Sequence, residues 1–180
     1  MSRRDEEAAD TTQKILESLH WLAMPVAVVG AARGSDRSCA TGTLNYVSLS
    51  PPMIATSLSR TSKTYGLAHQ SKRFSISLIR EDQADIAVLA ARRGATVDKF
   101  RELNLGIQQW SDVPALKDCG AVLWCSIEQE CPVGDYVLCV GRVQMAADGP
   151  RGRGPLLRFD GRYHRSGEQL AVTDESSYPL

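Results

Sequence analysis

Short alternating and β-branched runs dominate the chain once an opening helical stretch has ended. Apolar residues recur at near-helical spacing between Asp10 and Leu22, which predicts one amphipathic helix capped by Asp10. Four strand-like runs then follow, separated by turn signals such as RGSD and SPP: VAVVGA, CATGTLNYVSL, MIATSLS and RFSISLI. Strands this closely spaced along the chain favour a closed antiparallel sheet.

Helical and strand patterns alternate in the rest of the chain. KTYGLAHQS, DQADIAVLAARRG and VDKFREL predict three short helices, the second capped by Asp82 and ending at Gly94, and a polar loop is expected after the third. AVLWCSIEQEC and DYVLCVGRVQMA predict a hairpin joined through PVG, and LLRFDGRYHRSG predicts a last hairpin that turns at Asp160-Gly161. About seven strands with short helices predict a mainly β barrel, because closure removes exposed strand edges.

Length and charge limit the classes of protein that fit. The 180 residues predict a single domain with its core at about 20–165 and flexible tails at 1–9 and 173–180. A formal net charge of zero, from 21 basic and 21 acidic residues, lacks the electrostatic footprint of non-specific nucleic-acid binding. The charged first residues, and the absence of a run near the ~18 apolar residues of a spanning helix, predict no membrane segment and a cytoplasmic location.

The five cysteines predict neither a metal centre nor a disulfide framework. Their number is odd, and none of them forms a CxxC pair of the kind that zinc ribbons use. We therefore expect free thiols that pack as small apolar side chains, and no bound metal.

One hydroxyl-rich stretch, LSRTSKTYG, has the composition of a phosphate site. It combines two cations, Arg60 and Lys63, with the start of a helix whose first N–H groups lack partners, and with four hydroxyl residues: Ser59, Thr61, Ser62 and Thr64. Such a set would suit a phosphate monoester. A solvated turn with a serine or threonine N-cap is the alternative, and it explains the hydroxyls but not both cations.

Polar residues also recur at period two in the strand just before this stretch. Thr41, Thr43 and Asn45 alternate with other residues, so they share one face of the strand. That face could be solvated, or it could line a pocket for a planar ligand with several donors and acceptors. The spacing alone leaves both interpretations open.

Several motifs, in order along the chain, resemble those of the short-chain flavin reductase family. The run Val47–Pro52 is similar to its V-S-x-x-P-P motif, and residues 59–74 resemble the segment that follows there. FSISLIREDQADIA resembles the family's next strand and helix, DKF at 98–100 its D-K-F, and GDYVLCVGRV its G-D-H-x-x-x-x-G-x-V. The resemblance covers roughly residues 20–165.

The resemblance implies an FMN-binding split β-barrel with short decorating helices, usually a homodimer. It further implies hydride transfer from NADH or NADPH to FMN, with FAD as a possible substitute, and a separate monooxygenase that receives the reduced flavin. Carried over by motif, the flavin would lie along Thr41, Gly42, Thr43, Leu44, Asn45 and Ser48, and its phosphate would contact Ser62, Lys63 and Thr64. Beside the motif residues, Lys99 could extend the phosphate site. For Lys99 a solvated helix face is the alternative interpretation.

Two departures from the family pattern concern the hydride transfer. Tyr136 stands where the G-D-H motif has histidine, a position near the nicotinamide, and ATGTLN shifts the hydroxyl pattern beside the flavin. His164 could substitute near the nicotinamide, or it could be an exposed histidine at a strand end. The chain could therefore also be a flavoprotein that retains FMN as a redox carrier, or an oxidase or oxygenase of an organic substrate. In each case positioning, rather than a nucleophile or general base, is the expected contribution of the protein.

Overall fold

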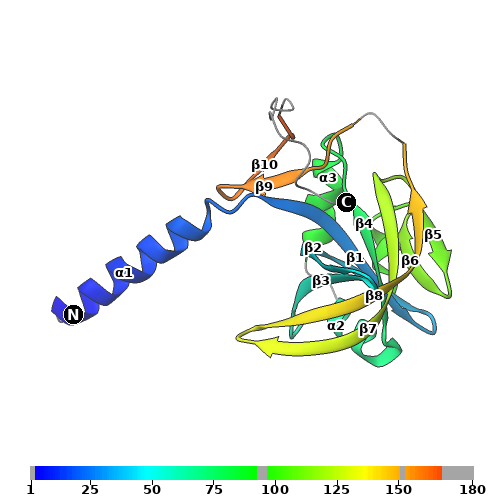
Figure 1. The fold of residues 1–180 in the computed structure, drawn as a ribbon, viewed down its shortest axis with the longest axis horizontal. Coiled ribbons are helices and arrows are strands. Elements are labelled where there is room, and N and C mark those ends of the chain that lie inside the picture. Colours follow the sequence, from blue (N-terminus) through cyan, green and yellow to red (C-terminus); the bar gives the residue numbers. More distant parts are fainter. Residues whose placement is uncertain (1–2, 93–96, 151–152, 168–180) are drawn as a thin grey trace.

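Six strands close into a β-barrel at the centre of the protein (Figure 1). The computed structural model describes residues 3–92, 97–150 and 153–167. Around the barrel the strands follow in the order β1 (Met24–Arg33), β2 (Asp36–Leu49), β3 (Pro52–Ser59), β8 (Tyr136–Asp148), β7 (Ala121–Val133) and β4 (Arg73–Leu78). Pairing of β1 with β4 completes the ring, and every pair is antiparallel. The prediction of a mainly β, closed barrel is confirmed.

Strand β1 is buried on both faces, which explains its unbroken apolar sequence. Ala27, Val29 and Ala31 face the barrel interior, where they pack with Phe74 and Ile76 of β4. The alternate residues Val26 and Val28 belong to a second core on the outside of the barrel. A strand covered on both sides has no polar face, so it reads as continuous hydrophobic sequence.

Helices and one small hairpin pack against the barrel. Helix α2 (Lys63–Ser71) packs Leu67 and Ala68 against the interior core, and its bounds match the predicted segment. The outer core is covered by α3 (Ala84–Ala91), α4 (Lys99–Glu102) and the hairpin of β5 (Ile107–Trp110) and β6 (Val113–Leu116). The prediction of a polar loop after the third short helix is therefore wrong in part, because β6 is buried at all four positions and pairs with β5.

The start of α3 also differs from the prediction. Its N-cap is Gln83, which makes no side-chain capping bond, rather than Asp82. The carboxylate of Asp82 instead forms ion pairs with Arg80 and Arg153. Ion pairs with two arginines stabilise the Asp82 carboxylate more strongly than a hydrogen bond from one backbone N–H would, so Asp82 does not cap α3. Gly94, the predicted end, lies outside the described residues.

Gly141 on β8 shows why the second glycine of the GDYVLCVGRV motif has to be a small residue. A Cβ built there would lie 2.6 Å from Cζ of Phe74 and 2.9 Å from Cβ of Cys125. Phe74 is fully buried in the barrel interior, so its ring occupies the space above the glycine. Close packing leaves no room for a methyl group there.

Helix α1 (Arg3–Leu19) projects away from the barrel (Figure 1). It starts seven residues before the expected cap, within the stretch expected to be a tail, and Asp10 forms an ion pair with Lys14 inside it at 2.6 Å. Glu and Ala are strong helix formers, which accounts for the earlier start. None of the helices in the described part of the chain is long and apolar enough to cross a membrane.

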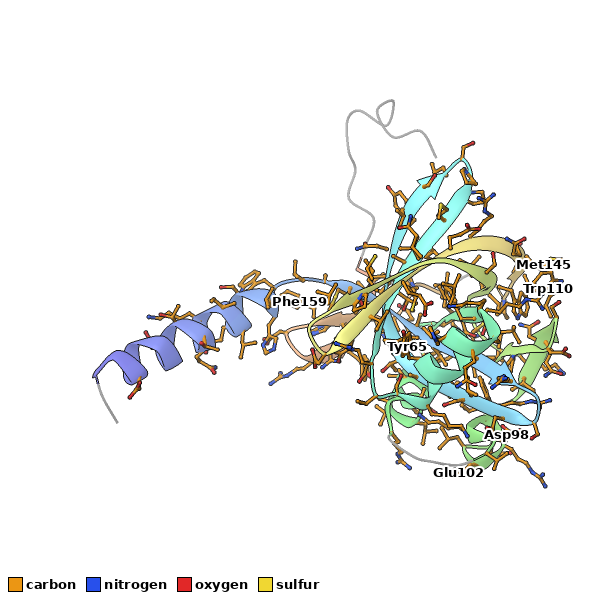
Figure 2. All side chains as sticks on the ribbon, turned by 90° about the horizontal axis from the view of Figure 1, so that it is seen from below. Tyr65, Asp98, Glu102, Trp110, Met145 and Phe159 are labelled. Carbon is orange, nitrogen blue, oxygen red and sulfur yellow. The ribbon has the colours of Figure 1, made fainter. Side chains whose placement is uncertain are left out.

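The last hairpin connects this projecting helix to the barrel. Strands β9 (Leu157–Phe159) and β10 (Arg162–His164) turn at Asp160-Gly161, both with positive φ, as predicted. The rings of Trp21 and Phe159 lie 5.8 Å apart, and Figure 2 shows Phe159 where α1 meets the body. The other edge of the hairpin pairs with Met24 and Pro25 of β1.

All five cysteines are free thiols, as predicted. Cys39, Cys119, Cys125 and Cys139 are buried and only Cys131 is exposed. Burial raises the pKa of the Cys39 thiol to about 11 and that of Cys125 to about 12, so both stay protonated at neutral pH.

Candidate active site

Three adjoining cavities form one groove along the outer face of β2 and β3. The central cavity, about 400 Å³, lies over Thr41, Thr43, Ser57 and Tyr136. It shares Thr41 and Tyr136 with a cavity of about 330 Å³ that we call the cationic cavity, because Lys63, Arg92 and Lys99 line it. At its other end it shares Thr43 and Ser57 with a distal cavity of about 430 Å³ over Asn45 and Val47.

The alternation of β2 places its polar residues on the groove side. Thr41, Thr43 and Asn45 line the groove, so the prediction of a shared polar face is confirmed. Leu44 points the other way, is 8% exposed and packs in the barrel interior. Gly42 also turns its missing side chain inward, where a Cβ would lie 2.6 Å from the Thr56 hydroxyl. A ligand in the groove can therefore contact mainly the backbone atoms of Gly42 and Leu44.

The hydroxyls of the predicted phosphate stretch serve different purposes. Ser62 is the N-cap of α2, where its Oγ accepts a hydrogen bond from the Tyr65 N–H at 3.1 Å and can still donate its own proton. The Thr64 hydroxyl is buried and lies 3.0 Å from that of Ser38. Thr61 is exposed and lines the cationic cavity. The N-cap interpretation is thus correct for Ser62, and a ligand can still use its O–H.

The two cations of that stretch point in different directions. The Arg60 guanidinium donates to the Gly134 carbonyl at 3.3 Å, in the turn between β7 and β8. Lys63, the first residue of α2, lies 3.6 Å from Asp36 and lines the cationic cavity. Arg60 therefore has a structural partner, and Lys63 carries the charge of this stretch that lines the cavity.

Lys99 lies inside the protein, so the alternative of a solvated helix face is wrong. Its ammonium donates to three backbone carbonyls, of Cys39, Ala90 and Arg92, at 2.6–2.8 Å. Burial lowers its pKa. The three bonds join β2 to the end of α3, and they leave the charge of Lys99 in the wall of the cationic cavity.

The neighbours of Lys99 explain the rest of the D-K-F motif. Asp98 is the N-cap of α4, where it accepts a hydrogen bond from the Arg101 N–H at 3.1 Å. Phe100 is buried in the outer core. Each residue of the motif thus has a structural role, and Lys99 alone also borders the groove.

The remaining predicted site residues lie at different distances from the groove. Tyr136, at the start of β8, is 46% exposed and lines the boundary between the central and cationic cavities. Ser48 follows a β-bulge at Val47 and lines none of the three cavities. The His164 ring lies 5.7 Å from that of Phe159, on the hairpin face that points away from the central cavity. The geometry supports a role at the groove for Tyr136 and gives no contact for His164.

The residues of the central cavity that sequence reasoning missed include Arg158 and Tyr163. They form a cross-strand pair of the β9–β10 hairpin, so both side chains lie on one face. That face reaches the groove only because Met24 of β1 pairs with Arg158. The sequence predicted the turn of this hairpin, but no local sequence pattern predicts which strand the hairpin pairs with.

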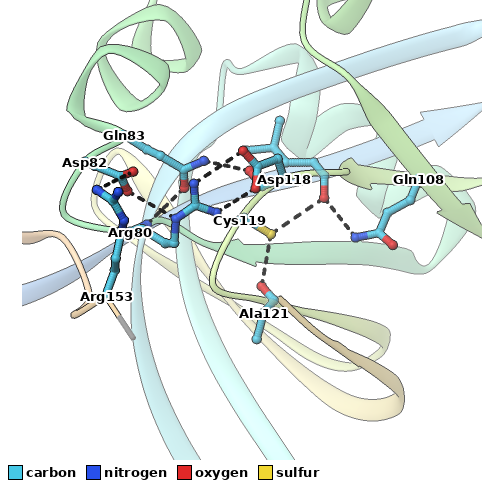
Figure 3. Close-up of polar contacts among 9 residues, drawn as sticks. Arg80, Asp82, Gln83, Gln108, Asp118, Cys119, Ala121 and Arg153 are labelled. Carbon is cyan, nitrogen blue, oxygen red and sulfur yellow. Dashed lines mark hydrogen bonds and ion pairs between the residues drawn. The ribbon is translucent and has the colours of Figure 1, made fainter. Parts of the chain in front are cut away.

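An arginine-centred cluster, which we call the Arg80 clasp, holds the chain that leads into this hairpin (Figure 3). The Arg80 guanidinium donates to both carboxylate oxygens of Asp118, at 2.6 and 3.3 Å, and to Asp82 at 3.1 Å. Asp82 also pairs with Arg153 at 2.9 Å, and the Glu81 N–H donates to the Gly154 carbonyl. The clasp therefore ties β4 to the residues just before β9.

We expect Asp118→Asn to flatten the acid side of the stability profile. Hydrogen bonds from Arg80 hold the pKa of Asp118 below its ordinary value of 3.8. A group whose pKa is lower in the folded than in the unfolded state stabilises the protein at pH values above its unfolded pKa. This stabilisation is lost as the pH falls through the folded pKa. The urea midpoint of the wild type should therefore drop more steeply than that of the variant below about pH 4.

Asp112→Asn is the matched control for this measurement. Asp112 makes no ion pair within the ranges that the structure describes, and it lies in the turn between β5 and β6. The urea midpoint of Asp112→Asn should fall with pH as steeply as that of the wild type. Parallel profiles for wild type and Asp118→Asn would show that the clasp adds nothing to stability.

Comparison with known proteins identifies the family. Residues 19–167 match the flavin reductase like domain. The NADH:riboflavin 5'-phosphate oxidoreductase of Streptomyces pristinaespiralis is 29% identical over 154 residues, which cover 84% of this chain and 86% of that protein. The NADH-dependent flavin reductase StyB of Pseudomonas fluorescens is 29% identical over 145 residues, covering 77% of this chain and 81% of that protein.

Solved structures agree with this match. The styrene monooxygenase flavin reductase of Pseudomonas putida aligns with a TM-score of 0.76 at 25% identity, covering 87% of this chain and 99% of that one. A homologue of nitrilotriacetate monooxygenase component B from Mycobacterium thermoresistibile has the same fold, with a TM-score of 0.82 at 19% identity over 97% of this chain and 98% of that one. The resemblance inferred from the motifs is confirmed, and the chain belongs to the flavin reductase like domain family.

Proposed function

We propose that this chain is an NAD(P)H:flavin oxidoreductase that binds FMN in the groove on β2 and β3. The observation that carries the proposal is the polarity of the groove, with cations at one end and neutral hydroxyls along its length. The donor set fits FMN, because Lys63 and the O–H of Ser62 can donate to a phosphate monoester, and the charge of Lys99 in the cavity wall favours an anion there. Thr41, Thr43 and the backbone of Gly42 suit the many polar atoms of a ribityl chain and flavin ring.

The protein's own contribution to the reaction is positioning. When bound, the flavin supplies the hydride acceptor, so no nucleophile or general base is needed from the chain. Thr41 and Thr43 form a floor that orients the ring, and Tyr136 borders it at the boundary of the two cavities. Hydroxyl and backbone N–H donors near the ring edge can stabilise the negative charge that hydride transfer adds there.

NADH is the proposed hydride donor, and a monooxygenase is the proposed acceptor of reduced flavin. The names of several relatives support the donor, including NADH:FMN oxidoreductase of Rhodococcus erythropolis, 28% identical over 122 residues. The styrene monooxygenase flavin reductase, as its name states, serves a monooxygenase, which supports the acceptor. A cytoplasmic location and the limits of the domain stay predictions.

A homodimer is the proposed assembly. Apolar side chains along α1 and just after it are 49–79% exposed: Ile15, Leu16, Leu19, Trp21 and Leu22. The rim of β2 near the distal cavity exposes three more, Tyr46, Val47 and Leu49. Apolar surface of this extent on two elements supports burial against a second copy. Sedimentation of the full chain would test it.

Anaerobic stopped-flow mixing of the FMN-loaded protein with NADH or NADPH tests the function directly. Loss of the oxidised flavin band near ~450 nm, followed by turnover when excess flavin is added, is the expected result. It would also identify the preferred donor. Flavin that binds but does not bleach would instead support the alternative, a carrier or an enzyme driven by an organic substrate, and would point to Tyr136 as the responsible departure.

A further inference from the structure

We propose that Arg158 and Tyr163 bind the phosphate-bearing part of the nicotinamide dinucleotide. The inference rests on the proposed function, since it assigns residues to the hydride donor of that reaction. Both residues line the central cavity, which meets the distal cavity at Thr43 and Ser57 on β2 and β3. They come from the β9–β10 hairpin, which lies outside the six-stranded barrel.

The register of the hairpin fixes which of its side chains meet the cavity. Arg158 and Tyr163 pair directly across the two strands and therefore share a face. Arg162 and His164 lie on the opposite face, where His164 and Phe159 are in ring contact. Pairing of Arg158 with Met24, together with the Arg80 clasp, keeps the hairpin against the cavity.

Charge separates this site from the one proposed for the flavin phosphate. Arg158 is the single cation among the described residues that line the central cavity, and it has no ion-pair partner in the described ranges. The other groove cations, Lys63, Arg92 and Lys99, lie in the cationic cavity beyond Thr41 and Tyr136. FMN carries its phosphate at one end only, so a second cationic position fits a second anionic ligand.

The chemistry of the two side chains suits a phosphate at the cavity mouth. A guanidinium binds phosphate oxygens through two parallel N–H donors, and it holds its charge at any pH of interest. Tyr163 adds a hydroxyl donor and an aromatic face beside it. Arg158 is exposed, so it can contact a ligand whose nicotinamide lies inside the central cavity while the rest extends outward.

The test compares dinucleotides with a dihydronicotinamide that lacks phosphate. In Arg158→Ala we expect KM for NADH to rise roughly ten-fold, because a hydrogen bond to a charged group is lost from an exposed position. KM for N-benzyl-1,4-dihydronicotinamide and the Kd of FMN should not change. Calorimetric titration of the FMN-loaded protein with NAD⁺ should show an affinity about ten-fold lower, and Arg158→Lys should restore part of it.

Arg162→Ala is the matched control, since it removes an arginine from the same hairpin on the face away from the cavity. It should behave as the wild type with every ligand. Equal losses for NADH and NADPH support binding of the diphosphate, and a loss confined to NADPH supports binding of its additional phosphate. Unchanged KM for both NADH and NADPH in Arg158→Ala would overturn the proposal, as would an equal loss with the phosphate-free donor, which would instead place Arg158 on the flavin ring.

Failure of the proposed function gives a different pattern. A wild-type protein that oxidises no dihydronicotinamide would contradict the reductase activity. The NAD⁺ titration would still decide the role of Arg158: a weaker titration in Arg158→Ala supports it, and absence of NAD⁺ binding by the wild type overturns it.

Discussion

Lys99→Met should lower the free energy of unfolding by about 3 kcal/mol, because it leaves three backbone carbonyls, two of them in buried hydrogen bonds, without their shared donor. The ammonium now bonds the carbonyls of Cys39, Ala90 and Arg92 at 2.6–2.8 Å. Methionine has a similar length and fills the space, so the change isolates the lost hydrogen bonds and charge. Urea denaturation followed by circular dichroism gives the stability, and fluorescence titration with FMN gives the affinity, which should also fall.

Lys63→Met is the control from the same cavity. Its ammonium lies 3.6 Å from Asp36 in a partly exposed ion pair, and such a pair contributes less than about 1 kcal/mol. Its stability should therefore change little, whereas its FMN affinity should fall about ten-fold with the loss of a phosphate contact. If Lys99→Met proves as stable as Lys63→Met, the hydrogen bonds of Lys99 to the backbone do not stabilise the fold.

Gly30→Ala should be the next most damaging change, with a loss of about 3 kcal/mol. A Cβ at this position of β1 would overlap the Pro114 carbonyl oxygen, and it would lie 2.6 Å from Oγ of Ser75 and 3.1 Å from the ring of Phe100. Ser75 donates to the same Pro114 carbonyl at 2.6 Å, so moving β6 away would break that bond as well. The midpoint of thermal or urea unfolding reports the loss.

Gly66→Ala is the control for Gly30→Ala. Gly66 lies within α2, and a Cβ there would meet nothing within 4 Å. Alanine is a better helix former than glycine, so a gain of about 0.5–1 kcal/mol is expected. Equal stability of the two variants would mean that β6 can move away from β1 at no cost.

Local patterns predicted the elements whose signals are complete within a few residues. The bounds of α2 follow from Ser62 as its cap and the helical spacing after it. The Asp160-Gly161 turn and the long β7–β8 hairpin were also predicted, since turn residues and alternation are short-range features. The shared polar face of Thr41, Thr43 and Asn45 follows in the same way from the two-residue period of a strand.

The errors fall where distant partners compete with a local signal. Asp82 was expected to cap α3, but Arg80 and Arg153 bind its carboxylate instead. Lys99 was given a solvated face as its alternative, yet carbonyls of β2 and α3 enclose its charge. The β5–β6 hairpin was expected as loop because its strands are short, and only packing against the outer core explains the burial of β6.

Taken alone, the sequence determined the fold class, the family and the strand that lines the groove, because periodicity, turn residues and ordered motifs are properties of neighbours along the chain. The tertiary structure decided which cations line the cavity, with Lys63 and Lys99 at the groove and Arg60 turned to the Gly134 carbonyl. It also decided that Arg158 and Tyr163 lie at the groove, far along the chain from Thr41. Closure of the barrel and docking of the hairpin on β1 set these contacts, and their energy comes from burial between segments that no local pattern connects.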